Sequence, residues 1–591
     1  MKTIIELITE EVKQAFVQKG FEERFGIVTI SNRPDLCQYQ CNGALAAAKQ
    51  YKTAPIKIAQ EITESLQVSK NFKVVTAIMP GFINITLSDE FLADYLNQMK
   101  ASEKFGFEKE ANPKTIVIDY GGPNIAKPLH VGHLRSAVIG ESIKRIMRFC
   151  GNNVIGDAHL GDWGTQMGLV IAEIKKRNPE LVYFDESYQG EYPKVAPFTM
   201  ADLQEIYPAA SAYSKSNPDF LEEAKYITYL LQNEHRGYTA IWNFMLEVSV
   251  TDLMKIYETL NVSFDLWKKE SDVQPYIPDM IQYFKDNNYT RISEGALVVD
   301  VKEETDTKEM PPCMILKTDG ATLYNTTDLA TIVERMKLFS PDKIIYITDK
   351  RQDLYFETVF RCAKKTKLIK EDTELYHIGY GTVNGKDGKP FKTRDGGVMR
   401  LESLITSVND EVYRKIMDNR TMEEEEARTI AAQVGLAALK YSDLSNVISK
   451  DYVFDIDRFT SFEGDTGPYI LYTIVRIKSI LAKFIEIKKD IILKSDSVIL
   501  YPTATSEQSL MLELAKFNEM LNFAYEEMAP YRICTYIYDL ANAFNSFYHD
   551  TKIITEEDAA KQASWITLIT LVQNILLTCI DLLGFEAPER M

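Results

Sequence analysis

The stretch TIVIDYGGPNIAKPLHVGHLRSAVIGESIKRIM, residues 115–147, decides the fold class of this chain. It begins as an apolar, largely β-branched run and ends with apolar residues at helical spacing. Between them, Gly121, Gly122 and Pro128 indicate a loop. Strand, loop and helix in this order are typical of a parallel sheet with crossover helices. In such sheets ligands bind at the carboxyl ends of strands, where a helix start offers unpaired N–H groups to an anion.

Two of the six histidines of the chain lie where this loop meets the helix. His130 and His133 are three residues apart and therefore share one helical face. Gly132, between them, would let a flat or phosphorylated ligand approach the backbone closely. Two other interpretations stay open, a pair of surface histidines or a metal-binding pair. A metal would need further ligands, and no H-E-x-x-H pattern accompanies the two residues.

The rest of the sequence divides into three parts. Residues 1–110 predict a small α/β domain with a leading amphipathic helix and two strands split by Pro80 and Gly81. Residues 111–400 contain the strand patterns TIVIDY, ALVVDV, KIIYIT and ELYHIGYG, with a long helix-rich insertion after the first. Residues 401–591 show helical periodicity throughout. The predicted fold class is α/β plus all-α.

The composition is that of a folded globular protein, with 45% hydrophobic and 26% charged residues. A net charge of −18 argues against indiscriminate binding of polyanions. It leaves open RNA binding on a local basic face, such as the helix face shared by Arg476 and Lys483, although a solvated face is the simpler interpretation. Seven scattered cysteines indicate reduced thiols, and Cys37 and Cys41 lack companions for a zinc site.

The N-terminal segment does not have the pattern of a secretory signal. Glu6, Glu10 and Glu11 interrupt its apolar positions. No other run of about 18 apolar residues stands out, so the sequence predicts a cytoplasmic protein without a membrane partner.

Several motifs carry a family resemblance. HVGH within PNIAKPLHVGHLRS resembles the HIGH motif of class I aminoacyl-tRNA synthetases, and the longer string resembles its arginyl-tRNA synthetase version. Further segments are similar to that family in the same order: HLGDWGTQMG (159–168), DGATLYNTTDLAT (319–331), GKPFKTRDGGVMRL (388–401), GDTGPYILYTIVRIKSI (464–480) and APERM (587–591). The matches span residues 120–591, and residues 1–110 resemble the additional N-terminal domain of the family.

The resemblance implies an arginine–tRNA ligase with a Rossmann-like catalytic domain. Such an enzyme activates arginine with ATP, accompanied by Mg²⁺, and then transfers it to the terminal adenosine of tRNA(Arg). It further implies a monomer whose N-terminal domain contacts the tRNA elbow and whose C-terminal helical domain binds the anticodon. Tyr469 and Tyr472 could stack on RNA bases there or belong to the core. The alternatives are a class I synthetase for another amino acid, a small-substrate adenylyltransferase and a non-catalytic tRNA-binding paralogue.

The resemblance also implies roles for individual residues. The predicted catalytic residues are His130, His133, Lys127, Lys389 and Lys392, and the predicted ATP-binding residues are Gly132, Lys127 and the two histidines. The residues predicted to bind arginine are Asn124, Glu270, Tyr324, Asp328 and Gln352. Tyr324 and Asp328 are four apart, hence on one helical face, and a carboxylate suits a guanidinium. No protein-held metal is expected.

Two departures from the family pattern affect these assignments. The usual KMSK loop reads KPFKTR at residues 389–394, which aligns in two ways, so either Lys392 or Lys127 supplies its second positive charge. Gly121 and Gly122 stand where the family commonly has serines. In HLGDWGTQMG, Asp162 and the glycines indicate either a second loop near the site or a turn packed by Trp163, and Asp162 is not included among the catalytic residues.

Overall fold

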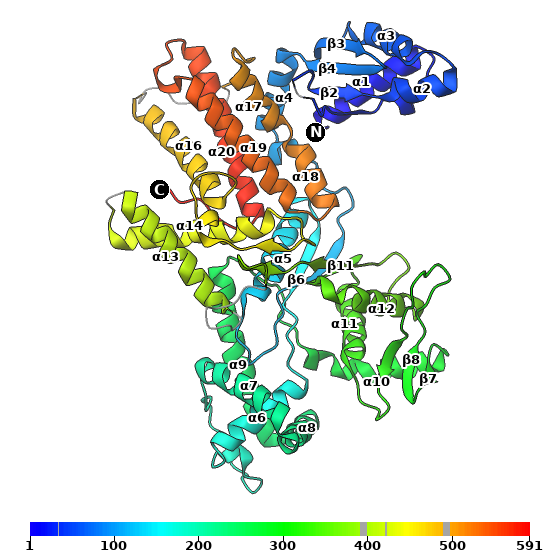
Figure 1. Ribbon diagram of the computed structural model, residues 1–591, viewed down its shortest axis with the longest axis vertical. Helices are drawn as coiled ribbons and strands as arrows, with labels where there is room; N and C mark the ends of the chain where they lie inside the picture. Colours follow the sequence, from blue (N-terminus) through cyan, green and yellow to red (C-terminus); the bar gives the residue numbers. More distant parts are fainter. Residues whose placement is uncertain (34, 390–398, 420–421, 488–496) are drawn as a thin grey trace. The chain divides into compact units, whose positions relative to one another are not determined.

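We describe a computed structural model of the chain that covers residues 1–33, 35–389, 399–419, 422–487 and 497–591. The chain divides into two compact units, which Figure 1 traces from the N-terminus in blue to the C-terminus in red. One unit contains residues 1–109, 462–581 and 586–591. The other contains residues 110–461 and 582–585 and holds the predicted site.

The central element of the second unit is a four-stranded parallel sheet in the order β11-β10-β5-β6. Its strands are β5 (Thr115–Asp119), β6 (Asn153–Asp157), β10 (Lys343–Asp349) and β11 (Glu374–Tyr380). The chain leaves β5 toward β6 on one side, whereas β10 and β11 lie on the other. The order therefore reverses between β5 and β10, and open α/β sheets bind ligands at the carboxyl ends of the strands at such a switch point.

The structure confirms the predicted strands at TIVIDY, KIIYIT and ELYHIGYG and corrects the fourth. ALVVDV forms β8 (Ala296–Val299), which pairs antiparallel with β7 (Arg291–Ser293) and β9 (Cys313–Leu316) in a separate sheet. The reason is a two-residue hairpin turn in which Glu294 and Gly295 both have positive φ, 49° and 83°. The missing parallel strand is β6, whose short NVIGD sequence gives a weak strand signal.

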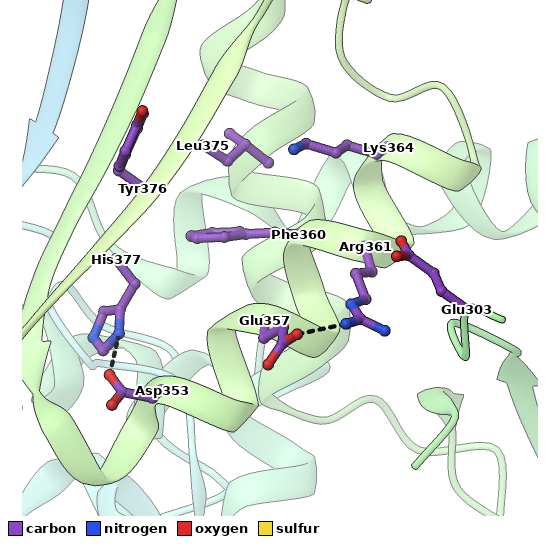
Figure 2. A pocket seen from close by; sticks show the side chains of 9 residues that line it. All are labelled: Glu303, Asp353, Glu357, Phe360, Arg361, Lys364, Leu375, Tyr376 and His377. Carbon is purple, nitrogen blue, oxygen red and sulfur yellow. Dashed lines mark hydrogen bonds and ion pairs between the residues drawn. The ribbon is translucent and has the colours of Figure 1, made fainter. Parts of the chain in front are cut away.

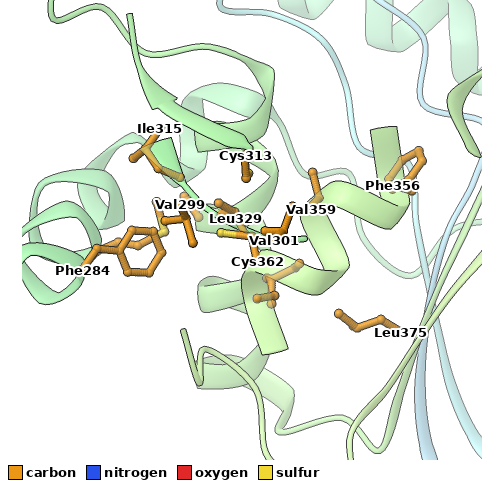
Figure 3. Close-up of a cluster of buried hydrophobic side chains, with 14 of the residues drawn as sticks. Phe284, Val299, Val301, Cys313, Ile315, Leu329, Phe356, Val359, Cys362 and Leu375 are labelled. Carbon is orange, nitrogen blue, oxygen red and sulfur yellow. The ribbon is translucent and has the colours of Figure 1, made fainter. Parts of the chain in front are cut away.

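Helices and the small sheet pack into one core beside the parallel sheet. α10 (Ile277–Asp286), α11 (Tyr324–Phe339) and α12 (Asp353–Lys365) bury apolar side chains against β8, β9 and β10. Figure 3 shows part of this core, including Phe284, Leu329 and Val359. The core fixes the start of α11, where Tyr324 lies. It also fixes the start of α12, which directly follows Gln352.

The predicted helical insertion lies between β6 and β7. Its helices are α6 (Thr165–Arg177), α7 (Met200–Ser216), α8 (Pro218–Gln232) and α9 (Arg236–Thr259). The insertion contacts the turn after β5, where Tyr257 Oη of α9 donates a hydrogen bond to the carbonyl of Gly121.

The helix that follows β5 is α5 (Val131–Phe149). α13 (Leu401–Asn419) and α14 (Glu424–Leu444) contact α5 and belong to the same compact unit as the parallel sheet. Arg135 of α5 is buried, and its Nε lies 3.1 Å from a carboxylate oxygen of Asp443 in α14. Two short strands, β12 (Val383–Asn384) and β13 (Tyr452–Val453), and the short α15 (Ile456–Phe459) complete the unit.

The other unit begins with the predicted small α/β fold. Its antiparallel sheet has the order β1-β2-β4-β3. The elements are α1 (Ile4–Gln18), β1 (Val28–Ile30), β2 (Tyr39–Cys41), α2 (Gly43–Tyr51), α3 (Pro55–Leu66), β3 (Phe72–Ile78), β4 (Phe82–Leu87) and α4 (Asp89–Ala101). The two strands predicted on either side of Pro80 and Gly81 are the hairpin of β3 and β4.

The same unit contains the C-terminal helices α16 (Gly467–Ile487), α17 (Thr505–Ala515), α18 (Phe517–Glu526), α19 (Tyr531–Asp550) and α20 (Ala559–Leu582). Contrary to the sequence expectation, α20 is long and apolar enough to cross a membrane by length and composition, alone among the helices of the described residues. Two thirds of its most apolar window, 67%, is buried within the protein. That burial is typical of the central helix of a bundle.

Candidate active site

A cavity of about 560 Å³ lies at the switch point of the parallel sheet. One wall is the turn after β5, and the other is the end of β10 with the short 3₁₀ helix η5 (Lys350–Gln352). The lining residues are Asp119, Tyr120, Gly121, Gly122, His133, Ser136, Ile347, Thr348, Asp349, Arg351, Gln352 and Tyr380. Two of the predicted site residues, His133 and Gln352, therefore line one cavity.

The turn after β5 requires its two glycines. Gly121 has a φ of +66°, which favours glycine, and its N–H donates to Ser136 Oγ at 2.9 Å. A Cβ on Gly122 would lie 2.1 Å from the carbonyl oxygen of His159. In this backbone a Cβ at Gly122 would clash and one at Gly121 would be strained, so the two glycines suit the turn as it is formed here.

The two histidines form the N-terminus of α5. His130 is the N-cap residue, and its Nδ1 accepts a hydrogen bond from the Gly132 N–H at 3.1 Å. His133 Nδ1 accepts from the His130 N–H at 3.0 Å. Each neutral ring therefore carries its proton on Nε2, which leaves one N–H donor per ring. A Cβ on Gly132 would lie 2.9 Å from the His130 ring, so this glycine makes room for the histidine.

Both imidazoles are neutral at neutral pH. Burial lowers the pKa of His133 to about 3, assisted by the positive potential of His130 and Lys127. Burial and Lys127 also lower the pKa of His130. Against a phosphate the pair would therefore act first as hydrogen-bond donors, not as cations.

Lys127 lies in the loop before this helix. Its Nζ is 5.9 Å from the ring centroid of Tyr207 in α7, within the range of a cation–π contact. The same helix contacts the segment after the second lysine motif, because Arg400 Nη1 donates to Gln204 Oε1. α7 therefore contacts Lys127 and also Arg400, which follows the second lysine motif, a link that no sequence motif indicated.

The second lysine motif is only partly within the described residues. Lys389 is exposed, and its carbonyl accepts from the Gly385 N–H at 2.8 Å. Lys392 lies outside the described residues. The segment that follows pairs with the histidine motif: the Val131 N–H donates to the carbonyl of Met399 at 3.1 Å, and the Leu401 N–H to that of Leu129 at 3.0 Å.

A second group of predicted residues forms an acidic region. Glu270 begins the 3₁₀ helix η4 (Glu270–Tyr276), and Asp328 lies one turn after the exposed Tyr324 in α11. Burial, together with the negative charges of Asp162 and Asp328, raises the pKa of Glu270 to about 7. Burial also raises the pKa of Asp328. Neither carboxylate forms an ion pair with a basic side chain of the described residues, so the region favours an added cation.

Two residues that sequence reasoning did not select hold this acidic region. Asp162 accepts hydrogen bonds from the N–H and the hydroxyl of Ser271, at 2.9 and 2.6 Å, and thereby fixes the residue next to Glu270. Tyr355 Oη donates to a carboxylate oxygen of Asp328. The HLGDWG motif could have identified Asp162, whereas no sequence signal joins Tyr355 to Asp328.

Asn124 lies beside the same HLGDWG segment. The Ile125 N–H donates to the carbonyl of Gly161 at 3.0 Å, and Asn124 Nδ2 donates to Gln166 Oε1 at 3.0 Å. A Cβ on Gly161 would lie 2.0 Å from Asn124 Oδ1. This glycine therefore lets the asparagine pack against the HLGDWG turn.

One cluster in the described part of the chain has the composition of a metal site, Asp119, Asp157 and His159. However, Arg335 Nη2 lies 2.6 Å from Asp119 Oδ2 and 2.8 Å from Asp157 Oδ2. The guanidinium thus already forms ion pairs with both carboxylates. His159 Nδ1 is 3.6 Å from Asp157, beyond hydrogen-bond distance. The cluster is a buried ion-pair network that joins β5, β6 and α11.

The C-terminal helices contain a separate basic cavity of about 560 Å³. Arg476 and Lys483 both line it, which confirms that they share a helix face, together with Tyr548, His549 and Lys552. Tyr469 and Tyr472 are not among the lining residues; Tyr469 Oη instead donates to Asn542 at 2.7 Å. Tyr548, which is 40% exposed, is the aromatic residue that faces this cavity.

Comparisons with known families match almost the whole chain. The description "tRNA synthetases class I (R), catalytic domain" matches residues 96–456. "DALR anticodon binding domain" matches residues 470–591, and "Arginyl tRNA synthetase N terminal domain" matches residues 2–87.

Curated relatives match from end to end. A protein named arginine–tRNA ligase from Agathobacter rectalis is 59% identical over 100% of both chains. Relatives of the same name from Alkaliphilus oremlandii and Francisella tularensis are 58% and 44% identical over 100% and 99% of both chains.

Solved structures show the same fold. The arginyl-tRNA synthetase of Plasmodium falciparum superposes with a TM-score of 0.81 at 25% identity, over 100% of both chains. That of Thermus thermophilus superposes with a TM-score of 0.76 at 21% identity, again over 100% of both. The predicted fold class, a Rossmann-like catalytic domain between a small N-terminal domain and a helical C-terminus, is confirmed.

Proposed function

Because the chain belongs to the arginyl-tRNA synthetase family of class I aminoacyl-tRNA synthetases, we propose that the cavity at the sheet switch point activates arginine with ATP and delivers it to tRNA. The arginine carboxylate attacks the α-phosphorus of ATP, a P–O bond to pyrophosphate breaks, and arginyl-adenylate forms. A ribose hydroxyl of the terminal adenosine of tRNA(Arg) then attacks the acyl carbon and releases AMP. Neither step needs a nucleophile from the protein.

The observation that carries this proposal is the acidic region of Glu270 and Asp328. Burial raises the pKa values of both carboxyl groups, and the charge of Asp328 contributes to the raised pKa of Glu270. A bound cation would favour the ionised form of both groups. A guanidinium is such a cation, always charged and able to donate to two carboxylates at once. Tyr324, Asn124 and Gln352 complete the proposed arginine site.

The histidine pair serves the nucleotide in this proposal. Its two Nε2–H donors lie at the N-terminus of α5, where the helix dipole also favours negative charge. Donors held in place before the reaction stabilise charge that develops on the α-phosphate without reorganisation. We assign His130, His133 and Gly132 to ATP, and Lys127, Lys389 and Lys392 to its phosphates.

Mg²⁺ enters this proposal with ATP, bound to its phosphates. The acidic cluster of Asp119 and Asp157 does not fit a resident metal, because Arg335 occupies both carboxylates. No step is therefore assigned to a metal held by the protein.

The remaining parts of the chain are proposed to bind tRNA. We assign the basic cavity of Arg476, Lys483 and Tyr548 to unpaired bases or phosphates, within residues 470–591, which match the anticodon-binding domain. We assign residues 1–110 to the tRNA elbow. We further propose that the enzyme works in the cytoplasm as a monomer.

Charging of total tRNA with each labelled amino acid tests the proposal. We expect arginine alone to be attached. Attachment of another amino acid would replace the arginine assignment, and binding of tRNA without any charging would favour a non-catalytic paralogue.

A further inference from the structure

A chain of three side chains runs from a second cavity to the active-site cavity. Thr348 Oγ1, at the end of β10, lies 2.7 Å from His377 Nε2 in the neighbouring strand β11. His377 Nδ1 lies 2.9 Å from Asp353 Oδ1 at the start of α12, the contact drawn in Figure 2. Thr348 lines the active-site cavity, whereas His377 and Asp353 line the second cavity, of about 420 Å³.

The packing holds this arrangement in place. The His377 side chain is only 7% exposed, and its ring stacks on Phe356 with centroids 4.6 Å apart. A Cβ on Gly379 would lie 2.6 Å from Asp353 Oδ1. The glycine in β11 thus leaves the space through which the aspartate reaches the histidine.

The donors and acceptors of each side chain determine which group donates in the two hydrogen bonds. An ionised carboxylate only accepts, so His377 Nδ1–H donates to Asp353. The neutral ring has no second N–H, so its Nε2 accepts the hydroxyl hydrogen of Thr348. Burial lowers the pKa of His377, which agrees with a neutral ring. The only proton of Thr348 Oγ1 therefore points away from the cavity, and its lone pairs remain for a ligand.

We propose that His377 and Asp353 are positioning residues that fix the Thr348 hydroxyl as a hydrogen-bond acceptor for the nucleoside of ATP. This rests on the proposed function. The triphosphate offers no donors, whereas the ribose hydroxyls and the adenine amino group do. The α-ammonium group of arginine is the other donor available, so the test must separate the two substrates.

The test compares the KM values for ATP and arginine in tRNA charging. Replacing Thr348→Val removes the hydroxyl with little change of shape, and we expect the KM for ATP to rise about three- to tenfold, the scale of one hydrogen bond, with the KM for arginine and kcat nearly unchanged. T348S should restore the wild-type value. Thr373→Val is the matched control, since Thr373 is buried and bonded to the Pro341 carbonyl before the amino end of β11.

A double-mutant cycle separates positioning from mere packing. His377→Phe keeps a ring against Phe356 but removes the acceptor, and we expect it to raise the KM for ATP as T348V does. In the T348V background it should add less than twofold, because the hydroxyl it orients is absent. Additive effects would overturn the role of His377. If H377F does not fold, as judged by circular dichroism, the T348V and T348S pair still decides the role of the hydroxyl.

ATP analogues identify the donor. 2′-Deoxy-ATP, 3′-deoxy-ATP and inosine triphosphate lack the 2′-hydroxyl, the 3′-hydroxyl and the adenine amino group in turn. For the analogue that lacks the group bound by Thr348, T348V should leave the KM unchanged. A rise in the KM for arginine alone would transfer Thr348 to the amino-acid site and overturn the nucleoside assignment, as would equal sensitivity of all nucleotides. A wild-type enzyme that charges no arginine would instead overturn the proposed function, so the two failures are distinguishable.

Discussion

Burial shifts the pKa values of the side chains in opposite directions at the two ends of the proposed site. At the nucleotide end, burial lowers the pKa values of His130 and His133, so the bases lose their protons. At the arginine end, burial raises the pKa values of Glu270 and Asp328, so the acids tend to keep theirs. Burial thus disfavours the charged form of these side chains at each end, and each end gains from a substrate of the opposite character. The kind of group that is desolvated, a base or an acid, therefore indicates the charge of the expected substrate.

The largest expected effect tests the nucleotide end. Replacing His133→Ala removes one preorganised donor, and we expect adenylate formation to slow by about 100-fold or more. Arginine-dependent ATP–pyrophosphate exchange, measured with tRNA present, checks this.

His235→Ala is the matched control for that variant. His235 also caps a helix start: it is the N-cap residue of α9 and accepts from the Tyr238 N–H at 3.4 Å, as His133 accepts from the N–H of the N-cap residue His130 in α5. It should leave the exchange rate unchanged. A similar loss in both variants would mean that helix capping, not phosphate binding, explains the effect.

The next effect tests the arginine end. Replacing Asp328→Asn removes a charge opposite the proposed guanidinium, and a hydrogen bond to a charged group is worth roughly 10- to 100-fold in affinity. We expect the KM for arginine to rise by that factor with a smaller change in the KM for ATP, measured by tRNA charging. Asp279→Asn, an exposed aspartate in α10, serves as the control. An unaltered KM for arginine would remove Asp328 from the binding site.

A pH profile separates the two ends more finely. Glu270, with a raised pKa of about 7, must ionise to bind a cation, so the KM for arginine should fall about tenfold between pH 6 and pH 8 and then level off. Glu270→Gln should remove this dependence. His133 contributes none over that range because its pKa is lowered to about 3, and the pKa of His130 is also lowered. A slope that persists in E270Q would assign the titration to another group, such as Asp162, whose pKa is raised to about 6 by burial.

The smallest effect concerns the contact between Lys127 and Tyr207. A cation–π contact is worth roughly 0.5–1 kcal/mol, so Tyr207→Leu should raise the KM for ATP about two- to fivefold. Tyr207→Phe keeps the ring and should behave as wild type. Equal behaviour of the two variants would show that the ring does not position Lys127.

Local patterns predicted the parts of the fold that consist of one continuous signal. β5, β10, β11 and α5 carry uninterrupted apolar or helical periodicity and lie where expected. β6 was not predicted, because its five residues include Asn153 and Gly156, which are uncommon in strands. β8 was recognised as a strand but assigned to the wrong sheet, since alternation and β-branching do not name the partner strand.

The same limit applies to the site. His130 and His133, or Tyr324 and Asp328, are predictable pairs because helical spacing brings them together. The hydroxyl of Tyr355 on Asp328 and that of Ser271 on Asp162 join residues 27 and 109 positions apart, and only the tertiary fold brings such groups into contact. The roles of Lys127 and Lys389 stay predictions, and Lys392 lies outside the described residues.

The raised pKa of Glu270 has a calorimetric consequence. A carboxyl group with a pKa of about 7 is partly protonated at pH 7, so arginine binding should release that fraction of a proton to the buffer. The observed heat of binding then includes the ionisation enthalpy of the buffer. Titrations in phosphate and in Tris should therefore give different apparent enthalpies for the same affinity, and the difference counts the protons that the guanidinium displaces.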